Sequence, residues 1–387
     1  MKGKQPSFAD WIISQNISED DPLQKIFSSV DFSFIRTLVP EASLGREGFD
    51  PVSLFKALLL IPLGEARSQR ELARKLRFDG RLSYLCGFSY GQTPSHNTFT
   101  VFKKRVGENR FREILENLIS QALSCRSKKG TSLAMDSTAV KAYSQEKFPS
   151  DADARWGAKE EGKYFFGYKL HASVIPSNLP LPASVEVSSG EAFDGNFFKP
   201  LLKNALKKVR VKKAIADAGY DTGANISFSE ENKIEPFIAS NPRNSKHSTF
   251  LSQLTVTAEG EVFCPAGRKL LYWGKEKRRE RIKFRCPLIK EGGECLFKTS
   301  CWKGRYGRSF YLSNFHSLSE KMKIFRTTRK FKRIYKKRQA IERFFSLLKE
   351  NFSLERKMKV RGTARVRTYI YIVVSAYVVS LLARGFG

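Results

Sequence analysis

The sequence of 387 residues is long enough for two or three domains with sizeable hydrophobic cores. Its hydrophobic share of 41% is typical of a globular chain and excludes a largely disordered one. The net charge of +31 favours a polyanionic partner: nucleic acid is the main candidate, and an anionic membrane surface is the alternative.

Neither end of the sequence predicts a membrane segment. Residues 1–6 are followed by no apolar core, so we expect no secretory signal peptide. The apolar run 368–383 holds 16 residues between Arg367 and Arg384, fewer than the roughly 20 that span a bilayer. We therefore expect a buried terminal helix and no membrane partner. Six cysteines without a signal peptide favour the reducing cytoplasm.

Residues 1–125 show helical patterns and are predicted to form an N-terminal DNA-binding domain. Pro51–Pro62 predicts a short core helix, and Ser68–Glu71 is a capping-box pattern that opens a second helix. Thr93–Ser95 predicts the start of a third, basic helix. Two helices joined by a turn, the second of them basic, favour a helix-turn-helix unit; a purely structural role is the alternative. The DNA-contacting residues predicted there are Lys103, Lys104 and Arg105.

From Ser132 the pattern changes to strands, and residues 126–240 are predicted to form the first part of an α/β core. We expect a hairpin or loop in the polar segment 144–163. The order of three strands, a helix, a strand, a helix, a strand and a later helix is that of an RNase H-like fold, a mixed sheet with helices on both faces. In such a sheet the first and fourth strands are adjacent. The strands expected are 132–142, 164–174, 181–187, 213–217 and 234–239, and the helices are 194–209 and a short one ending near 232.

Residues 241–325 interrupt this pattern and are predicted to form a small insertion that contains cysteines. It is polar, contains glycine and holds four of the six cysteines: Cys264, Cys286, Cys295 and Cys301. A structural Zn²⁺ site at these four residues is one hypothesis, although no Cys-x-x-Cys pair is present. Reduced thiols packed in a β-rich insertion are the other.

Residues 326–387 are predicted to complete the core with a catalytic helix and a C-terminal helix. The segment that leads into the first of these helices is basic, since 321–338 holds ten Lys or Arg among 18 residues and no acid. Tyr335 to Lys349 predicts a helix. At about 100° per residue, Arg338, Glu342 and Lys349 share with Tyr335 a stripe roughly 60° wide, beside an apolar face. The simplest alternative is a surface helix on which Glu342 only pairs with Arg338.

The spacing Tyr335, Arg338, Glu342, Lys349 resembles the Tyr-Arg-Glu-Lys signature of bacterial insertion-sequence DDE transposases. Leu133–Thr138, which contains Asp136, is similar to the strand that carries the first acid of that family. Ile215–Asp221, which contains Asp217, is similar to the second-acid motif, and Phe166–His171 is similar to the second strand. The helices before residue 125 are similar to the domain that precedes the core in many of these proteins.

The resemblance implies a catalytic triad of Asp136, Asp217 and Glu342 that binds two Mg²⁺ ions, with Mn²⁺ as a substitute. Ions about 4 Å apart would activate water or a 3′-hydroxyl and stabilise the leaving oxygen. The reaction would cleave DNA at the element ends and join the freed 3′-hydroxyls to target DNA. The same resemblance implies phosphate contacts, and with the basic run the predicted DNA-binding residues here are Tyr335, Lys336, Lys337, Arg338 and Lys349.

The partners implied are double-stranded DNA, both the terminal inverted repeats and the target, and a second copy of the chain on that DNA. The expected location is the cytoplasm, on the nucleoid. A catalytically inactive transposase-derived DNA-binding protein and a nuclease that only hydrolyses are the alternatives. Asp221 competes with Asp217 for the second position, but we interpret Asp221 as a helix cap. We expect His171 to be a packed strand residue and not a ligand.

Overall fold

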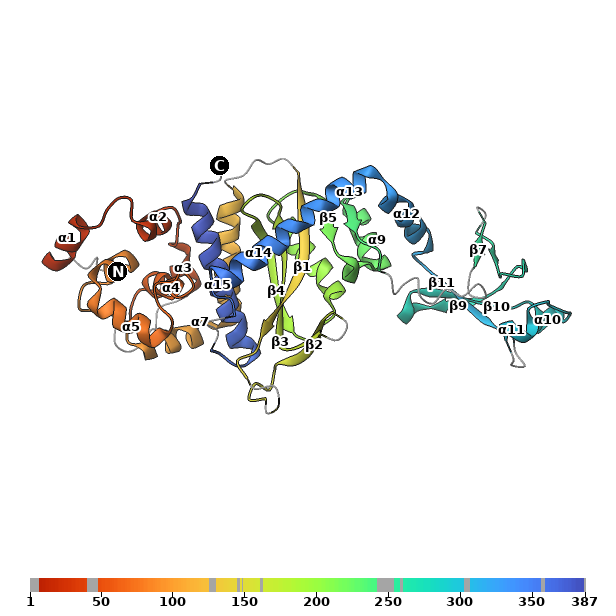
Figure 1. Cartoon of the computed structure of the whole chain (residues 1–387), viewed down its shortest axis with the longest axis horizontal. Coiled ribbons are helices and arrows are strands. Elements are labelled where there is room, and N and C mark those ends of the chain that lie inside the picture. Colours follow the sequence, from red (N-terminus) through yellow and green to blue (C-terminus); the bar gives the residue numbers. More distant parts are fainter. Residues whose placement is uncertain are drawn as a thin grey trace. The chain divides into compact units, whose positions relative to one another are not determined.

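The computed structural model describes residues 7–39, 48–124, 130–144, 147, 149–160, 163–241, 254–257, 260–302, 307–355 and 359–385. The chain divides into two compact units, and Figure 1 labels their helices and strands. The first comprises Met1–Ala216 and Lys336–Gly387, and the second comprises Asp217–Tyr335. The four-part division expected from the sequence stays a prediction, and its boundary at residue 125 lies outside the described residues.

Helices make up the N-terminal part of the first unit. Asp50 caps α4, whose residues are nearly all buried, and Ser68 caps α5 by accepting from the Glu71 amide at 3.2 Å. Both expected helices are therefore confirmed. The third begins later than predicted: Ser95, and not Thr93, accepts from the Thr98 amide at 3.3 Å. The helices are α1 (Phe8–Gln15), α2 (Pro22–Ser28), α3 (Phe34–Leu38), α4 (Pro51–Leu59), α5 (Gln69–Phe78), α6 (Gly80–Cys86) and α7 (His96–Ser124).

Two features alter the helix-turn-helix expected in this region. A further short helix, α6, lies in the chain between the two helices of the predicted unit. The basic helix also continues into the long helix expected near residue 111, so that both form α7. The two parts of α7 meet at a kink at Gly107, whose φ of 73° and ψ of 163° are accessible to glycine and strained for other residues.

A mixed sheet follows the helices in the first unit. Strand β1 pairs antiparallel with β3 on one side and parallel with β5 on the other. The second edge of β3 is shared, because β2 pairs with its first half and β4 with its second half. These strands are β1 (Thr131–Lys141), β2 (Arg155–Glu160), β3 (Lys163–Ile175), β4 (Leu181–Ser189) and β5 (Val211–Ala216). The predicted adjacency of the first strand and the strand before Asp217 is confirmed.

Strand β2 lies in the polar segment that the sequence predicts as a hairpin or loop. Its composition gives no apolar alternation, because it reads Arg-Trp-Gly-Ala-Lys-Glu. It forms by antiparallel pairing with β3, with Trp156 opposite Phe166 and their rings 5.6 Å apart. Cross-strand aromatic contacts of this kind stabilise a sheet edge that propensity alone does not predict.

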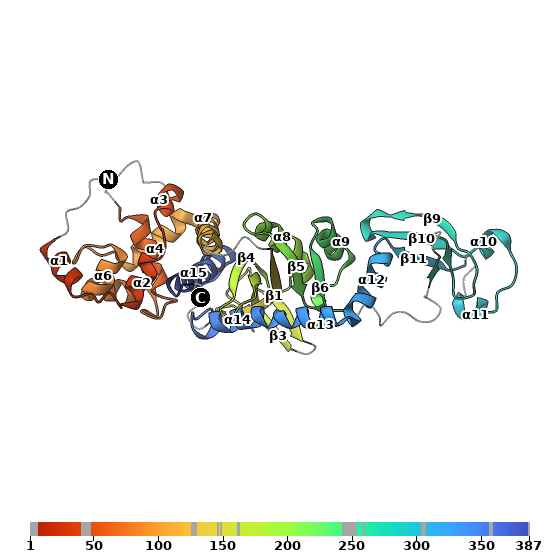
Figure 2. The ribbon, with the colours of Figure 1, turned by 90° about the horizontal axis from the view of Figure 1, so that it is seen from above.

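Helices cover both faces of this sheet, as Figure 2 shows for α8 (Phe198–Leu206) and α14 (Gln339–Glu350). Helix α8 follows the 3-10 turn η1 (Asp194–Phe197) and packs on β3 and β4. Helix α14 packs on β1 and β3. A helical N-terminal region followed by a mixed sheet between helices is the RNase H-like architecture, so the predicted fold class is confirmed.

The last helix, α15 (Thr363–Ala383), lies in the core of the first unit, packed on α7, α2, α4 and β4. Its apolar 18-residue window is 72% buried, and it is the one described helix long and apolar enough to cross a membrane. Its first turn is capped from elsewhere in the chain, because Asp153 accepts from the Thr363 amide at 2.8 Å. The predicted buried terminal helix is confirmed.

The second unit combines helices with small sheets. Its elements are η2 (Ala218–Tyr220), α9 (Gly223–Glu231), β6 (Glu235–Ile238), β7 (Thr255–Val256), β8 (Val262–Phe263), β9 (Leu271–Glu276), η5 (Lys277–Arg279), β10 (Arg281–Arg285), α10 (Leu288–Glu291), α11 (Lys298–Cys301), β11 (Ser309–Ser313), α12 (His316–Thr327) and α13 (Arg329–Tyr335). Strands β9, β10 and β11 form an antiparallel sheet, and β7 pairs with β8. The insertion is β-rich, as the sequence predicts.

Candidate active site

The first predicted acid, Asp136, lies at the middle of β1, where a buried run gives way to partly exposed residues. Its side chain is 17% exposed, and its Oδ1 accepts from the Ser137 amide at 2.8 Å. In the parallel pair of β1 and β5, Met135 lies opposite Ala216. Asp136 and Asp217 are the residues that follow these two in the chain.

Asp217 directly follows β5 and is the first residue of the second unit. Its carboxylate caps the 3-10 turn η2 by accepting from the Gly219 amide at 2.9 Å. This local hydrogen bond is the turn role that any Asp before Ala-Gly can take. It involves Oδ1, and therefore one oxygen of the carboxylate.

The third predicted acid, Glu342, lies in the first turn of α14 and is exposed, with 52% of its side chain accessible. Ile341, Phe344 and Leu348 form the buried face of this helix, as expected. The helix predicted from Tyr335 to Lys349 is, however, not continuous. Helix α13 ends at Tyr335, and the 3-10 turn η6 (Lys336–Arg338) separates it from α14.

Arg338 joins two of the three predicted acids. Its Nη1 donates to Asp136 Oδ2 at 2.7 Å, and its Nη2 donates to Glu342 Oε1. Two carboxylates thus share one guanidinium: Asp136 lies 202 residues from Arg338 in the sequence, and Glu342 lies four residues from it. The basic partner of Asp136 comes from η6, and the residues around Asp136 on its own strand could not reveal it. Because a forked cation binds both acids, it offsets their mutual repulsion.

The other cations of the signature differ in their surroundings. Lys349 Nζ donates to the Ala139 carbonyl of β1 at 3.1 Å and forms an ion pair with Glu355 at 3.0 Å. Lys336 and Lys337 are exposed on η6. The ring of Tyr335 stacks on Phe331 with centroids 5.5 Å apart.

Asp221, the competing candidate, is held in an ion pair within the second unit. Its Oδ1 accepts from Arg326 Nη2 at 2.6 Å and its Oδ2 from the Asn241 amide at 2.9 Å. The side chains of Asp221 and Arg326 are 10% and 13% exposed. Thr222, and not Asp221 as predicted, caps α9 by accepting from the Asn225 amide. Both Asp221 oxygens therefore have structural partners.

His171 is a packed residue, as predicted. It is fully buried in β3, its Nε2 lies 2.8 Å from Ser188 Oγ, and its ring stacks on Phe197 at 3.8 Å. Burial lowers the pKa of His171 to about 4, although the nearby Asp194 carboxylate opposes this shift. The imidazole is therefore neutral at physiological pH.

The cations predicted on the basic helix lie in different environments on α7. Lys104 and Arg105 are exposed, whereas Lys103 is partly buried. Burial and the positive charge of Arg365 lower the pKa of Lys103 to about 8. Lys104 and Arg105 are thus the more accessible of the three to a DNA backbone.

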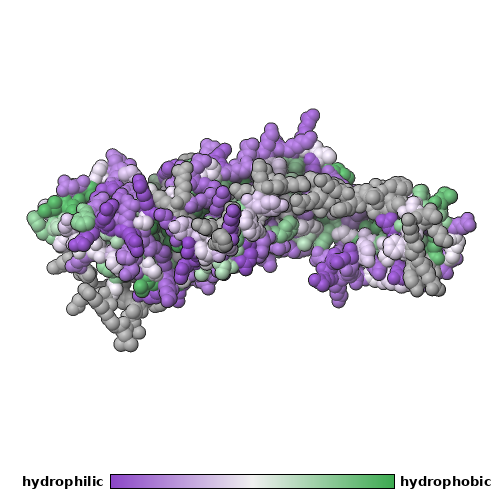
Figure 3. All heavy atoms as spheres, turned by 60° about the horizontal axis from the view of Figure 1, so that its bottom comes forward, coloured by the Kyte–Doolittle hydropathy of each residue, from purple (hydrophilic) through white to green (hydrophobic). Residues whose placement is uncertain are grey.

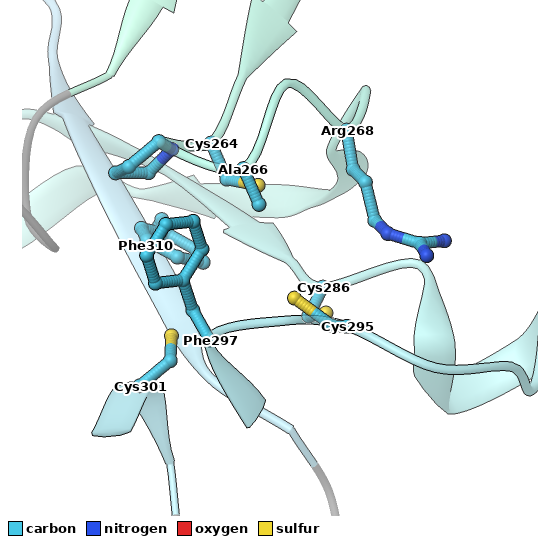
Figure 4. A pocket seen from close by; sticks show the side chains of 9 residues that line it. Cys264, Ala266, Arg268, Cys286, Cys295, Phe297, Cys301 and Phe310 are labelled. Atoms are coloured by element: carbon cyan, nitrogen blue, oxygen red, sulfur yellow. The ribbon is translucent and has the colours of Figure 1, made fainter. Parts of the chain in front are cut away.

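The four cysteines of the insertion line one pocket, in which Figure 4 shows their side chains together with Phe297 and Phe310. All four are free thiols. Burial, and to a smaller extent the other three thiols, raise the pKa of Cys286. Among the described residues, no group of three or more His, Cys, Asp or Glu side chains is arranged to hold a metal ion. The zinc prediction therefore has no support, and packed thiols describe what is observed.

The same finding bears on the predicted acidic triad. Carboxylate oxygens are the donors that Mg²⁺ and Mn²⁺ prefer, so Asp136, Asp217 and Glu342 fit such an ion in chemistry. Their arrangement is not that of a ready metal site within the described chain. One oxygen each of Asp136 and Glu342 accepts from Arg338 instead.

Comparison with known families agrees with this picture. A family model described as "Transposase DDE domain" matches residues 127–379, and one described as "Transposase domain (DUF772)" matches residues 12–105. No curated protein sequence matches the chain.

Since the first match covers well over half of the 387 residues, the chain belongs to the DDE transposase family. Membership implies DNA binding and transposase chemistry, and proteins of this family generally use divalent metal ions. The match begins before β1 and ends within α15, so it takes in the sheet, the insertion and α14.

Proposed function

We propose that this chain is an active DNA transposase that binds the ends of its insertion element, cleaves there and joins the 3′-hydroxyl ends to target DNA. Asp136, Asp217 and Glu342 are its catalytic carboxylates. The observation that carries the proposal is the fork of Arg338 between Asp136 and Glu342, because it gathers acids from β1 and α14 at the edge where β5 leads into Asp217.

In this proposal the three carboxylates hold divalent cations, Mg²⁺ or Mn²⁺. When bound, such ions supply an activated attacking oxygen and stabilise the leaving oxygen of a phosphodiester. Arg338 would also contact the DNA. When the cations engage its carboxylate partners, its guanidinium would bind a DNA phosphate, whose geometry it matches with two parallel hydrogen bonds.

The surrounding cations extend this phosphate-binding surface. Lys336 and Lys337 are exposed beside Arg338, and Lys349 follows along α14. Tyr335 would contact a terminal phosphate. Lys104 and Arg105 on α7, with a smaller part from Lys103, would bind the double-stranded terminal repeat. Hydrophilic residues predominate on much of the face in Figure 3, and the net charge of +31 makes such a surface attractive to DNA.

Joining two element ends requires two active sites, so we infer a homodimer on DNA. We also place the protein in the cytoplasm on the nucleoid, where its substrate lies. Both statements rest on the proposed reaction.

The test uses a supercoiled plasmid that carries the element's own ends, incubated with the full chain and Mg²⁺. The wild type is expected to nick the ends and give joined products. Asp136→Asn, Asp217→Asn and Glu342→Gln should each abolish both products while binding to the ends persists. Asn at 217 keeps an oxygen for the Gly219 amide, which preserves the turn.

A matched control is Glu350→Gln, which changes an exposed acid on the same helix as Glu342. This variant should retain cleavage and joining. Binding without nicking by the wild type would instead identify an inactive DNA-binding relative, and nicking without joining would identify a hydrolytic nuclease.

A further inference from the structure

The three-stranded sheet of the second unit has two unlike faces. Side chains alternate between faces along a strand. Ile282 and Phe284 of β10 belong to an apolar cluster with Val262 and Leu270. The remaining residues of β10 therefore point to the opposite face, and they are all cations: Arg281, Lys283 and Arg285.

Two aromatic residues share this cationic face. Tyr311 of β11 lies opposite Lys283 in the register, and Trp273 is the extra residue of β9 at a bulge beside Lys283 and Phe284. The Arg281 guanidinium carbon lies 3.7 Å from the Tyr311 ring centroid, and that of Arg285 lies 4.2 Å from the Trp273 ring. We call these five residues, Trp273, Arg281, Lys283, Arg285 and Tyr311, the arginine–aromatic face.

The aromatic rings of this face remain accessible. Trp273 is 43% exposed and Tyr311 is 41% exposed. They belong to the two strands that flank β10, which places their strands roughly 10 Å apart at the usual spacing of neighbouring strands. Two rings at this separation, each with a guanidinium stacked on it, form a platform wide enough for more than one base.

The charge of this face is incompletely balanced. Glu276, opposite Arg281, is its one acid in the strand register, and it accepts from Arg281 Nε at 2.6 Å. The Nε atom of Arg285 is buried and makes no hydrogen bond to any described residue. Arg281 is paired with Glu276, whereas Lys283 and Arg285 form no ion pair with a described residue, so an anionic oxygen brought close to their exposed donors would be favoured.

We propose that the arginine–aromatic face binds single-stranded DNA, with bases stacked on Trp273 and Tyr311 and phosphates held by Arg281, Lys283 and Arg285. Interleaved aromatic rings and cations on an open sheet are the chemistry that recognises unpaired nucleotides. In a duplex the faces of the bases are covered by their neighbours, so two flat rings would have nothing to stack on. The inference rests on the proposed function only in taking DNA as the substrate; it does not require cleavage.

The experiment measures binding of the full chain to a labelled short oligothymidine and to a duplex of equal length by fluorescence anisotropy. The main variant is Trp273→Leu with Tyr311→Leu, which leaves the charge unchanged. Its affinity for the oligothymidine should fall by roughly 30-fold or more, as expected for the loss of two base-stacking contacts. Its affinity for the duplex should change by less than about 3-fold.

The matched control is Tyr272→Leu. Tyr272 is the neighbour of Trp273 on the same strand and is 60% exposed, but its ring lies against Phe284 on the other face. This variant should bind the oligothymidine as the wild type does. A thermal melt of every variant separates loss of binding from loss of folding.

A second pair of variants tests the cations without touching the rings. Lys283→Gln should lower the slope of log affinity against log salt for the oligothymidine by about 0.7, the value for one phosphate contact to a single strand. Lys275→Gln removes the same charge from the opposite face of the sheet and should change the slope less.

Four results would overturn the inference. Three are unchanged oligothymidine binding by the double aromatic variant, an equal loss with Tyr272→Leu, and an equal loss for duplex and single strand. The fourth is an RNA oligonucleotide bound more tightly than its DNA counterpart. The plasmid cleavage assay is run alongside on the wild type and on Asp136→Asn. If the wild type cleaves no more than Asp136→Asn while the loss of oligothymidine binding in the aromatic variant persists, the proposed function fails and this inference stands.

Discussion

The substitution Arg338→Gln tests whether the guanidinium holds Asp136 and Glu342 together before any divalent cation binds. The bond to Asp136 is partly buried, since the two side chains are 23% and 17% exposed, so its loss should cost about 2 kcal/mol. The bond to Glu342 is more exposed and should add at most about 1 kcal/mol. At roughly 2 °C per kcal/mol for a chain of this size, Tm without divalent ions should fall by about 4–6 °C.

The same substitution should make the site bind Mg²⁺ more readily. In the wild type the ion competes with a resident cation for carboxylate oxygens, and in the variant that competitor is gone. Relief of about 1.4 kcal/mol corresponds to a tenfold gain in affinity. The gain is measured as the Mg²⁺ concentration that gives half of the maximal rise in Tm, which needs no DNA and no turnover.

Lys337→Gln is the matched control, because it removes one exposed positive charge from the same turn. It should leave Tm within about 1 °C and alter Mg²⁺ affinity only through long-range charge. The reasoning is refuted if Arg338→Gln is as stable as the wild type in EDTA and shows the same Mg²⁺ dependence. In that case the fork between the acids contributes nothing, and Arg338 would act on DNA alone.

Three further outcomes follow from buried ionisable groups. His171 has a pKa below that of an unfolded histidine, so stability is lost as pH falls from about 6.5 towards 4. Between pH 7 and pH 4.5 the free energy of unfolding in urea should therefore fall by about 2–3 kcal/mol more in the wild type than in His171→Gln. The charged Lys103, whose pKa is lowered to about 8, destabilises the folded state below about pH 8 and does so progressively less as pH rises to 10.5. Lys103→Met should therefore raise Tm more at pH 7 than at pH 10. The control Lys104→Met, at an exposed position, should leave Tm unchanged at both pH values. Arg326→Gln removes the cation that is paired with the largely buried Asp221 carboxylate, and should lower the free energy of unfolding by about 3–5 kcal/mol. Part of this loss should be recovered in the double variant with Asp221→Asn, and a fully additive double variant would contradict the coupling.

Strong local patterns allowed much of the fold to be predicted from the sequence. Apolar runs predicted β1, β3 and β4 nearly to their ends and located α4, and the capping-box pattern at Ser68 located α5. Strand β2 was missed because its stability comes from its partner β3 and not from its own composition. The break at η6 was also missed, since nothing in the residues from Lys336 to Arg338 disfavours an α-helix.

The candidate site could be predicted in its members but not in its contacts. The three acids were identified because the motifs around them resemble those of DDE transposases, and this much a sequence shows. That Arg338 reaches from η6 to β1 depends on the packing of α14 against the sheet, which no local pattern contains. For the cysteines, the members could be predicted from the sequence but not the kind of site. The four line one pocket, yet among the described residues they do not have the arrangement of a metal site.

Because the first unit is formed by two separate segments of the chain, it cannot fold completely until the second unit has been synthesised. Its first segment ends at Ala216 and its second begins at Lys336, so the whole of the intervening unit is synthesised in between. At about 5–20 residues per second, that delay is roughly 6–24 s. During this time the surface of α7, α2, α4 and β4 that α15 later covers stays exposed on the nascent chain, where chaperones would protect it. A transposase translated only to residue 335 would lack both Glu342 and the helix that closes its core, so truncated products should be inert as well as short-lived.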